Sequence, residues 1–133
     1  FSGEAVSREE LIVSLISAFD IPPHMILEGY SMTENNTLML RCPYGRFHMA
    51  PLLEPVILDE ALNPQEGSNL TGTFGFLDAM ALTYPGFIIS GDYVNMIDGA
   101  CDCGLTGPAI LHIERISGTE IKGCGGIMSS FQV

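Results

Sequence analysis

The sequence has few basic residues. It contains 5 Lys and Arg against 16 Asp and Glu, which gives a formal net charge of −11 at pH 7. Binding to nucleic-acid backbones depends on clustered Lys and Arg that neutralise phosphates and release counterions. The composition therefore argues against a nucleic-acid-binding protein. The acidity is most simply explained as a device for solubility.

Long hydrophobic runs are also missing, although 47% of the 133 residues are hydrophobic. The longest apolar stretches, around residues 11–19 and 79–89, are interrupted by Ser, Thr, Pro or Gly. Neither approaches the roughly 20 residues that a membrane-spanning helix needs. No basic segment precedes a hydrophobic run, as it would in a signal peptide. We therefore expect no membrane insertion, a cytoplasmic location and a single domain with one core.

One helix is predicted near the N-terminus. Ser7 and Glu10 have the spacing of a capping box, in which each side chain bonds the other residue's backbone amide. Five apolar side chains then fall on one helical face, and the helix should end before Pro22. The pattern predicts a helix over residues 8–19; its apolar face is formed by Leu11, Ile12, Leu15, Ile16 and Phe19.

From residue 25 onward the sequence is typical of β structure, with short apolar runs separated by turn residues. The predicted strands are 25–28, 37–41, 54–58, 70–78, 87–90, 93–97 and 109–116. The expected fold class is α+β, mostly β: one N-terminal helix followed by an antiparallel sheet or a distorted barrel. Residues 1–121 should form this domain. Three glycines within residues 122–126 predict a hinge or linker over 122–133.

Residues 29–34 (Gly-Tyr-Ser-Met-Thr-Glu) follow an apolar run and are suited to bind a nucleotide. A small residue at Gly29 allows backbone to approach a ligand, and Tyr30 offers a flat face to a purine. The Thr33 hydroxyl can donate to a phosphate, and the Glu34 carboxylate can hold Mg²⁺. Taken alone, the segment could equally be a polar turn after a strand.

Two later sites extend the pattern. Asp92 follows Gly91 after an apolar strand, where its carboxylate could accept both hydroxyls of a ribose. Arg115 closes the last predicted strand, just before a glycine-rich stretch. The simpler alternatives are a Gly-Asp turn for the first and a surface or ion-paired arginine for the second.

Four cysteines and three histidines suggest a metal site. Cys101 and Cys103 form a tight pair in a turn, and Cys42 and His48 flank another turn. If the two turns meet, three thiolates and one imidazole would form a closed tetrahedral zinc site. Free buried thiols and disulfides are the alternatives. Cys124 is left over and could be a reactive thiol.

In their order and spacing, the three nucleotide-binding segments resemble the adenylate-forming superfamily, which includes the acyl-CoA ligases. The closest resemblance is to the branch of phenylacetate-CoA ligase and LuxE-type acyl-protein synthetases. In that branch the Gly-Asp strand is followed by a Cys-x-Cys-Gly turn, seen here at residues 101–104. Gly3 and Glu4 also resemble the segment that precedes the tyrosine motif. The resemblance covers essentially the whole chain.

The resemblance implies catalytic roles, mainly charge stabilisation and alignment, for Thr33, Glu34 and Arg115. It implies that ATP or AMP is bound by Gly29, Tyr30, Thr33, Asp92 and Arg115. Tyr30 would stack on adenine, Asp92 would bind the ribose hydroxyls, and Glu34 would position Mg²⁺. Thr33 would contact the α-phosphate and Arg115 the ribose or a phosphate. Metal clusters also occur at such cysteine turns in this branch.

Two features of the family are missing from the sequence. No Ser/Thr/Gly-rich phosphate loop ending in Lys is present, and Lys122 precedes the position of the catalytic C-terminal domain. Arg115 lacks the usual preceding Gly, and Thr119 and Glu120 replace the usual acidic pair. We therefore expect the central part of a larger enzyme, whose partners include its own N- and C-terminal domains.

The expected reaction uses MgATP to convert a carboxylic acid into an acyl-adenylate, and then transfers the acyl group to a thiol of CoA or of a protein. The main alternative is a non-catalytic, zinc-stapled β module that binds a partner protein. A secreted domain held by disulfides is a third possibility.

Overall fold

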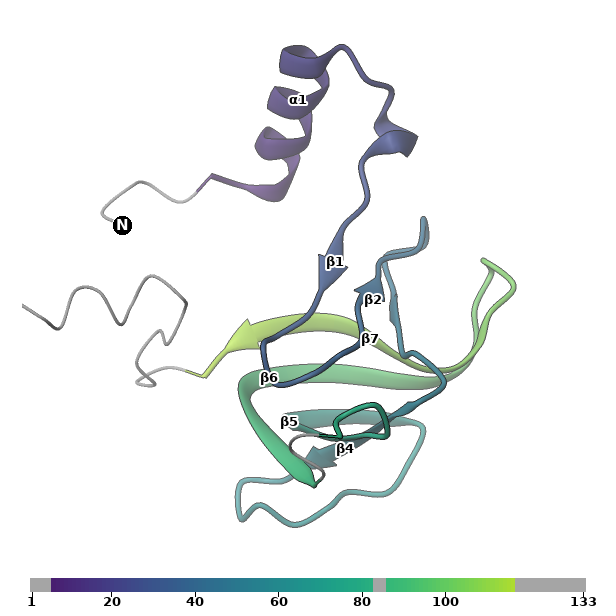
Figure 1. Cartoon of the computed structure of the whole chain (residues 1–133). Coiled ribbons are helices and arrows are strands. Elements are labelled where there is room, and N and C mark those ends of the chain that lie inside the picture. The colour runs from purple at the N-terminus through teal and green to yellow at the C-terminus, as the bar shows by residue number, and fades with distance from the viewer. Residues whose placement is uncertain (1–5, 83–85, 117–133) are drawn as a thin grey trace, which may run out of the picture.

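A computed structural model of the chain describes residues 6–82 and 86–116 (Figure 1). It contains, in order, α1 (Arg8–Phe19), a 3₁₀ turn (Pro23–Met25), β1 (Gly29–Tyr30), β2 (Met39–Leu40), β3 (Phe47–His48), β4 (Leu53–Leu58), β5 (Asn69–Asp78), β6 (Phe87–Ala100) and β7 (Thr106–Arg115). The hinge expected over residues 122–133 lies outside the described residues. So do Gly3, Glu4 and Cys124.

Helix α1 begins and ends where the sequence predicts. The Ser7 hydroxyl accepts the Glu10 amide at 3.2 Å, and the Glu10 carboxylate accepts the Ser7 amide at 3.0 Å. No residue of the helix is buried, and the helix stands apart from the sheet (Figure 1). Arg8 joins it to the rest of the fold by donating to the Glu28 carboxylate at 2.8 Å. Glu28 also accepts from Arg41 at 2.9 Å, so one carboxylate bridges two arginines.

The sheet is antiparallel and has five strands in the order β3-β7-β6-β5-β4. Strands β1 and β2 form a separate two-stranded ribbon. The long strand β6 is strongly curved, and the sheet curls into half a barrel (Figure 1). The expected fold class, α+β and mostly β with an N-terminal helix and an antiparallel sheet, is confirmed.

The core fills the inner face of this curled sheet. Phe74 and Phe76 alternate with Gly75 on β5, are fully buried, and stack with ring centroids 5.5 Å apart. Fully burying one such side chain contributes roughly 1.5–3 kcal/mol. Val94 and Ile110 continue the core across β6 and β7. The side chain of Met39 from the small ribbon is also fully buried there, so the ribbon is fixed to the sheet.

Several predicted strands differ from the observed ones. Residues 25–28 are not a strand, because the Pro22-Pro23 sequence leads into a 3₁₀ turn and the strand begins only at Gly29. The strand expected over 37–41 is shortened to β2, and Arg41 adds a single bridge to Phe47. The two-residue strand β3 was not predicted, because it is too short to show a pattern.

The predicted strands 87–90 and 93–97 are one continuous strand, β6. Gly91 and Asp92 therefore lie within a strand and not at its end. The reason is a bulge: residues 90–92 of β6 lie opposite Phe74 alone on β5, between the pairs Ile89–Gly75 and Tyr93–Thr73. An extra segment of this kind bends a strand without breaking it.

Strands β6 and β7 also extend past the predicted strand ends at residues 97 and 109, because their ladder continues to the hairpin, with Gly99 opposite Gly107. Among the described residues, no helix has the length and apolarity required to cross a membrane.

Candidate functional site

Three of the predicted site residues meet where β6 bulges. Asp92 lies on the core-facing side of β6, two residues before the buried Val94, and pairs with Arg115 at the end of β7. The Tyr30 hydroxyl, from β1, donates to Asp92 Oδ2 at 2.7 Å. Arg115 Nη1 donates to Asp92 Oδ1 at 2.6 Å. Residues separated by 62 and 23 positions are thus joined through one carboxylate.

This carboxylate is nearly enclosed. The side chain of Asp92 is 9% exposed, whereas that of Arg115 is 49% exposed. Burial and the bond to Asp92 raise the pKa of the Tyr30 phenol well above its ordinary value, so the phenol stays protonated and donates. The Asp92 carboxylate likewise raises the pKa of Arg115. Each Asp92 oxygen keeps a further lone pair, so the carboxylate can accept additional hydrogen bonds.

The Tyr30 ring packs against the core on its inner side. Its centroid lies 6.3 Å from that of Phe47 and 6.1 Å from that of Phe74. A Cβ at Gly29, next to it, would lie 2.7 Å from Leu38 Cδ1, the end of an exposed side chain that can turn away, so packing alone does not require glycine here. The assignment of both residues to nucleotide binding stays a prediction.

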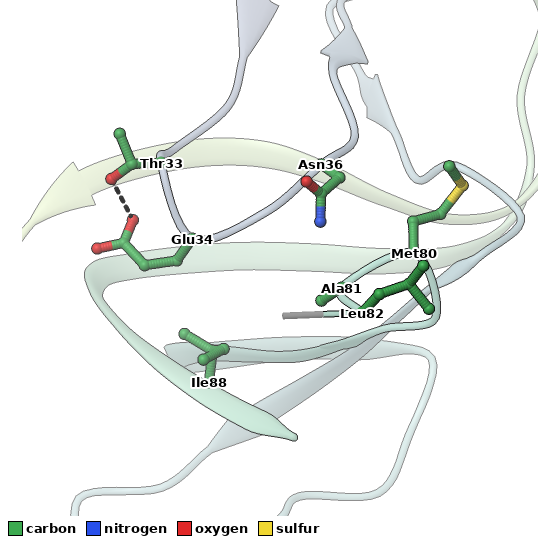
Figure 2. Close-up of a pocket in the computed structure, with 7 residues that line it drawn as sticks. All are labelled: Thr33, Glu34, Asn36, Met80, Ala81, Leu82 and Ile88. Carbon is green, nitrogen blue, oxygen red and sulfur yellow. Dashed lines mark hydrogen bonds between the residues drawn. The ribbon is translucent and has the colours of Figure 1, made fainter. Parts of the chain in front are cut away.

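Thr33 and Glu34 lie in the loop between β1 and β2, beside a pocket of about 580 Å³ (Figure 2). The Thr33 hydroxyl donates to Glu34 Oε2 at 3.0 Å. The Glu34 charge is close enough to Arg115 to add to the rise in its pKa. The remaining walls of the pocket were not predicted, and they are formed by Asn36, Met80, Ala81, Leu82 and Ile88. No periodic pattern in the sequence marks these residues as neighbours, because they come from two loops and one strand.

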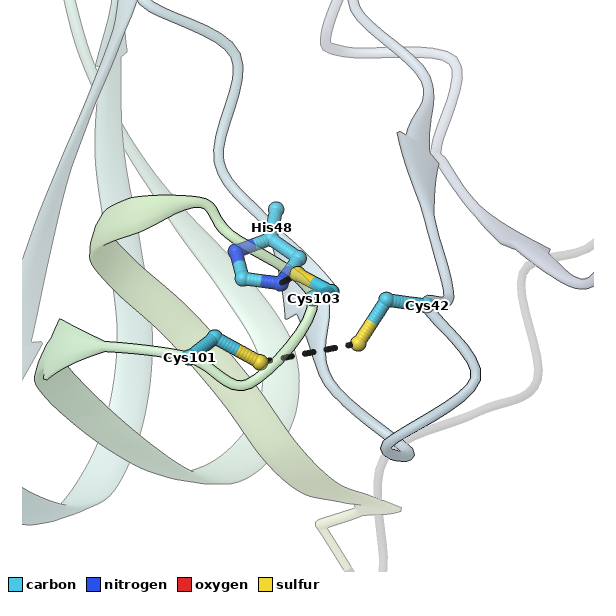
Figure 3. Close-up of side chains that lie close together, drawn as sticks. All are labelled: Cys42, His48, Cys101 and Cys103. Atoms are coloured by element: carbon cyan, nitrogen blue, oxygen red, sulfur yellow. Dashed lines mark hydrogen bonds between the residues drawn. The ribbon is translucent and has the colours of Figure 1, made fainter.

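The four predicted metal ligands also come together (Figure 3), at the end of the β6–β7 ladder away from Asp92 and Arg115. Cys42 follows β2, His48 lies on β3, and Cys101 and Cys103 lie in the hairpin between β6 and β7. All four ligand atoms lie within 4.8 Å of one another. Cys42 Sγ lies 3.9 Å from Cys101 Sγ, and Cys103 Sγ lies 3.2 Å from His48 Nε2.

These separations suit zinc. Zinc–sulfur bonds of about 2.3 Å and zinc–nitrogen bonds of about 2.0 Å at tetrahedral angles place two sulfurs about 3.8 Å apart and a sulfur and nitrogen about 3.5 Å apart. The observed distances of 3.9 and 3.2 Å are close to these edges. The described cysteines, Cys42, Cys101 and Cys103, are free of disulfide bonds.

The two cysteine turns are built alike. The Cys42 amide donates to the Arg46 carbonyl at 2.8 Å, and the Gly45 amide donates to the Cys42 carbonyl at 2.9 Å. The second turn repeats both bonds, at 2.8 and 2.9 Å, around Cys101 and Gly104. Both glycines have positive φ, 81° and 91°, which a side chain would strain. Cys42 and Cys101, the first cysteine of each turn, therefore have the same backbone hydrogen bonds.

Thiol chemistry at this corner favours metal binding. Burial raises the pKa of the Cys42 thiol, but hydrogen bonds from the Arg46 amide, His48 and other neighbours outweigh it and lower the pKa to about 6. The pKa of Cys103 is raised: the Leu105 amide lowers it, but burial and the neighbouring thiols more than offset this. A thiolate is the form that binds metal, and a cation between these sulfurs would relieve their mutual repulsion.

A family model described as "Acyl-protein synthetase, LuxE" matches residues 1–132 of the chain. No curated protein and no solved structure shows significant similarity to it.

Proposed function

The chain belongs to the LuxE family of acyl-protein synthetases, and on that premise we propose that it is the nucleotide-binding part of an AMP-forming acid–thiol ligase. One observation carries the proposal: Tyr30 and Arg115 both donate to the buried Asp92 carboxylate, and Glu34, whose charge acts on Arg115, borders a pocket together with Thr33. The three segments that resemble the nucleotide motifs of adenylate-forming enzymes therefore share one region of the fold.

The proposed reaction has two steps. In the first, a carboxylate oxygen of the acid attacks the α-phosphorus of ATP, and the bond to pyrophosphate breaks, leaving an acyl-adenylate. In the second, a thiolate of CoA or of an acceptor protein attacks the acyl carbon, and AMP leaves with the bonding electrons. Neither step needs a nucleophilic side chain of this chain, so its residues would act by alignment and charge stabilisation.

The resemblance implies the residue roles, and the positions of the side chains are compatible with them. Asp92 would accept the ribose hydroxyls through the lone pairs that Tyr30 and Arg115 leave free, and Tyr30 would stack on adenine with its outward side. Thr33 would donate to the α-phosphate at the pocket. Arg115 is half exposed and would turn its remaining donors to the ribose or a phosphate.

The residues present also fit the two metals that the resemblance implies. Glu34 supplies carboxylate oxygens at the pocket, the type of ligand that Mg²⁺ prefers, and bound Mg²⁺ would offset the negative charge of the phosphates. Cys42, His48, Cys101 and Cys103 would hold zinc in a closed site, whose contribution is structural. A net charge of −11 makes such cations useful to a protein that binds ATP.

The remaining functions would belong to other parts of the same enzyme. A phosphate loop and a catalytic lysine are expected outside residues 1–133, and residues 122–133 would form the hinge toward the C-terminal domain. The acyl acceptor, CoA or protein, and the cytoplasmic location are proposed on the same grounds.

The test is carboxylate-dependent ATP–pyrophosphate exchange by the intact gene product, with a panel of aryl and fatty acids. Exchange with any acid supports adenylate formation. The Asp92→Ala variant should lose about 2–4 kcal/mol of transition-state stabilisation, which is a rate lower by about 30- to 1000-fold. Asp98→Ala is the matched control, because Asp98 is exposed on the same strand. An Asp92→Ala rate equal to that of the control would refute the ribose role.

A further inference from the structure

Asp78, the last residue of β5, is a buried carboxylate that the proposed chemistry does not use. It is 7% exposed. Its Oδ2 accepts the backbone amide of Asn36 at 2.7 Å and the side-chain amide of Asn36 at 3.4 Å. Its Oδ1 accepts the backbone amide of Met80 at 2.8 Å. Each oxygen of one carboxylate is therefore bound to a different segment of the chain.

The two segments are opposite walls of the pocket. Thr33, Glu34 and Asn36 line it from the loop between β1 and β2, and residues 80–82 line it from the segment after β5 (Figure 2). Within the described parts of the chain, the bonds from Asn36 to Asp78 are the hydrogen bonds that join residues 31–36 to the sheet. The contacts Thr33–Glu34 and Asn35–Met32 stay inside the loop.

The carboxylate suits this position for a physical reason. Burying a carboxylate is costly unless its oxygens are hydrogen-bonded. Moving either segment away from Asp78 would leave a buried oxygen without a donor, and this cost keeps both segments close. Bonds from an amide to an ionised oxygen are also about twice as strong as those to a neutral one. The Asn36 amide, the largest cause, lowers the pKa of Asp78, so the group stays charged at neutral pH.

We propose that Asp78 is a positioning residue of the adenylation site, which holds the Thr33–Glu34 loop at a fixed distance from residues 80–82. The inference rests on the proposed function, because it assigns Thr33 and Glu34 to the phosphates and their cation. Asp78 itself touches no reacting atom. It acts by keeping the opening in which MgATP must meet the carboxylic acid at a constant width.

The test compares Asp78→Asn with Asp59→Asn in the intact gene product. Asp59 is the matched control, because its Oδ1 also accepts amides two and four positions later, from Ala61 and Asn63, but it reaches no distant loop. Hydrogen–deuterium exchange of residues 31–36 should become about tenfold faster in Asp78→Asn and stay unchanged in Asp59→Asn. This measurement needs no substrate.

The kinetic readout is ATP–pyrophosphate exchange. Asp78→Asn should raise the KM for MgATP about tenfold, by more than it lowers kcat, while Asp59→Asn should leave both unchanged. Asp78→Glu, which keeps the charge but moves the oxygens by one methylene, replaces Asp78→Asn if that variant does not fold, and should also raise KM.

Two results would overturn the inference: protection of residues 31–36 that matches the wild type, or an equal rise in KM in the Asp59→Asn control. A wild-type protein that catalyses no exchange with any acid would refute the proposed function instead. Amide exchange would then decide by itself whether Asp78 holds the loop.

Discussion

The Tyr30–Asp92 hydrogen bond should contribute more to the free energy of unfolding than the Arg115–Asp92 ion pair, although the ion pair is the shorter contact. The distances are 2.7 and 2.6 Å. Tyr30 donates to a carboxylate whose side chain is only 9% exposed, so water does not compete for the bond. A hydrogen bond to a charged group contributes about 1.5–3 kcal/mol. Arg115 is 49% exposed, and a pair screened by solvent to this degree contributes about 0.2–1 kcal/mol.

Two double-mutant cycles measure these terms. One combines Tyr30→Phe with Asp92→Ala, and the other combines Arg115→Ala with Asp92→Ala. Each variant is unfolded in urea, and the coupling energy is the part of the double-mutant effect that the single effects do not explain. Tyr30→Phe removes only a hydroxyl and keeps the packing of the ring against Phe47 and Phe74, so it isolates the bond.

The expected coupling is about 2 kcal/mol for the tyrosine pair and less than about 1 kcal/mol for the arginine pair. A tyrosine coupling near zero would show that Asp92 is solvated in solution. A reversed ranking would refute the argument that burial, and not length, decides the strength of these contacts.

Two further predictions concern the cluster of Cys42, His48, Cys101 and Cys103 and the attachment of helix α1. The purified protein should contain about one zinc ion per chain, measured by elemental analysis. Cys101→Ser or a chelator should lower both this zinc content and the melting temperature. A protein that stays equally stable without metal would contradict the prediction. At the helix, the bond from Arg8, partly offset by burial, holds the pKa of Glu28 at about 2, below its ordinary value of 4.5. A depressed carboxyl pKa stabilises the fold above the ordinary value, and this stability is lost as the pH falls from about 4.5 to about 2. Because the Glu28 side chain is 29% exposed, Glu28→Gln should lower the free energy of unfolding in urea at pH 7 by only about 1 kcal/mol. The variant should also show a weaker pH dependence of this free energy between about pH 4.5 and 2. An unchanged pH dependence would refute the depressed pKa of Glu28.

Local rules predicted the local structure. The capping box at Ser7 and Glu10 defines the start of α1 without any tertiary contact, and both bonds are present. The turn residues around Cys42 and Cys101 likewise predicted two tight turns. What the sequence could not reveal is that β3 pairs with β7, which is the pairing that brings the two turns together. That pairing involves two residues at each strand and leaves no periodic pattern.

The errors have a similar origin. A Gly-Asp pair commonly marks a turn, yet here the ladder with β5 is interrupted only between Ile89 and Tyr93, and the ladder with β7 begins at Asp92. Whether the chain turns or bulges at such a pair depends on partners far away in the sequence. Asp78 was missed for the same reason, since its principal partner, Asn36, is 42 positions away and its own neighbourhood is an ordinary strand end.

The β1–β2 ribbon connects the cysteine–histidine cluster (Cys42, His48, Cys101 and Cys103) with the proposed nucleotide site. Tyr30 pairs with Met39, and Cys42 follows three residues later, so one short ribbon carries the Asp92 contact at one end and a ligand at the other. The ribbon has two residues in each strand and is therefore too short to be stable alone. The buried Met39 side chain fixes it to the core, and a metal bound by Cys42 would add a second attachment. Loss of that metal would leave the ribbon, and with it the Tyr30–Asp92 bond, held by the core alone, so a structural metal here would also act on the geometry of the proposed nucleotide site.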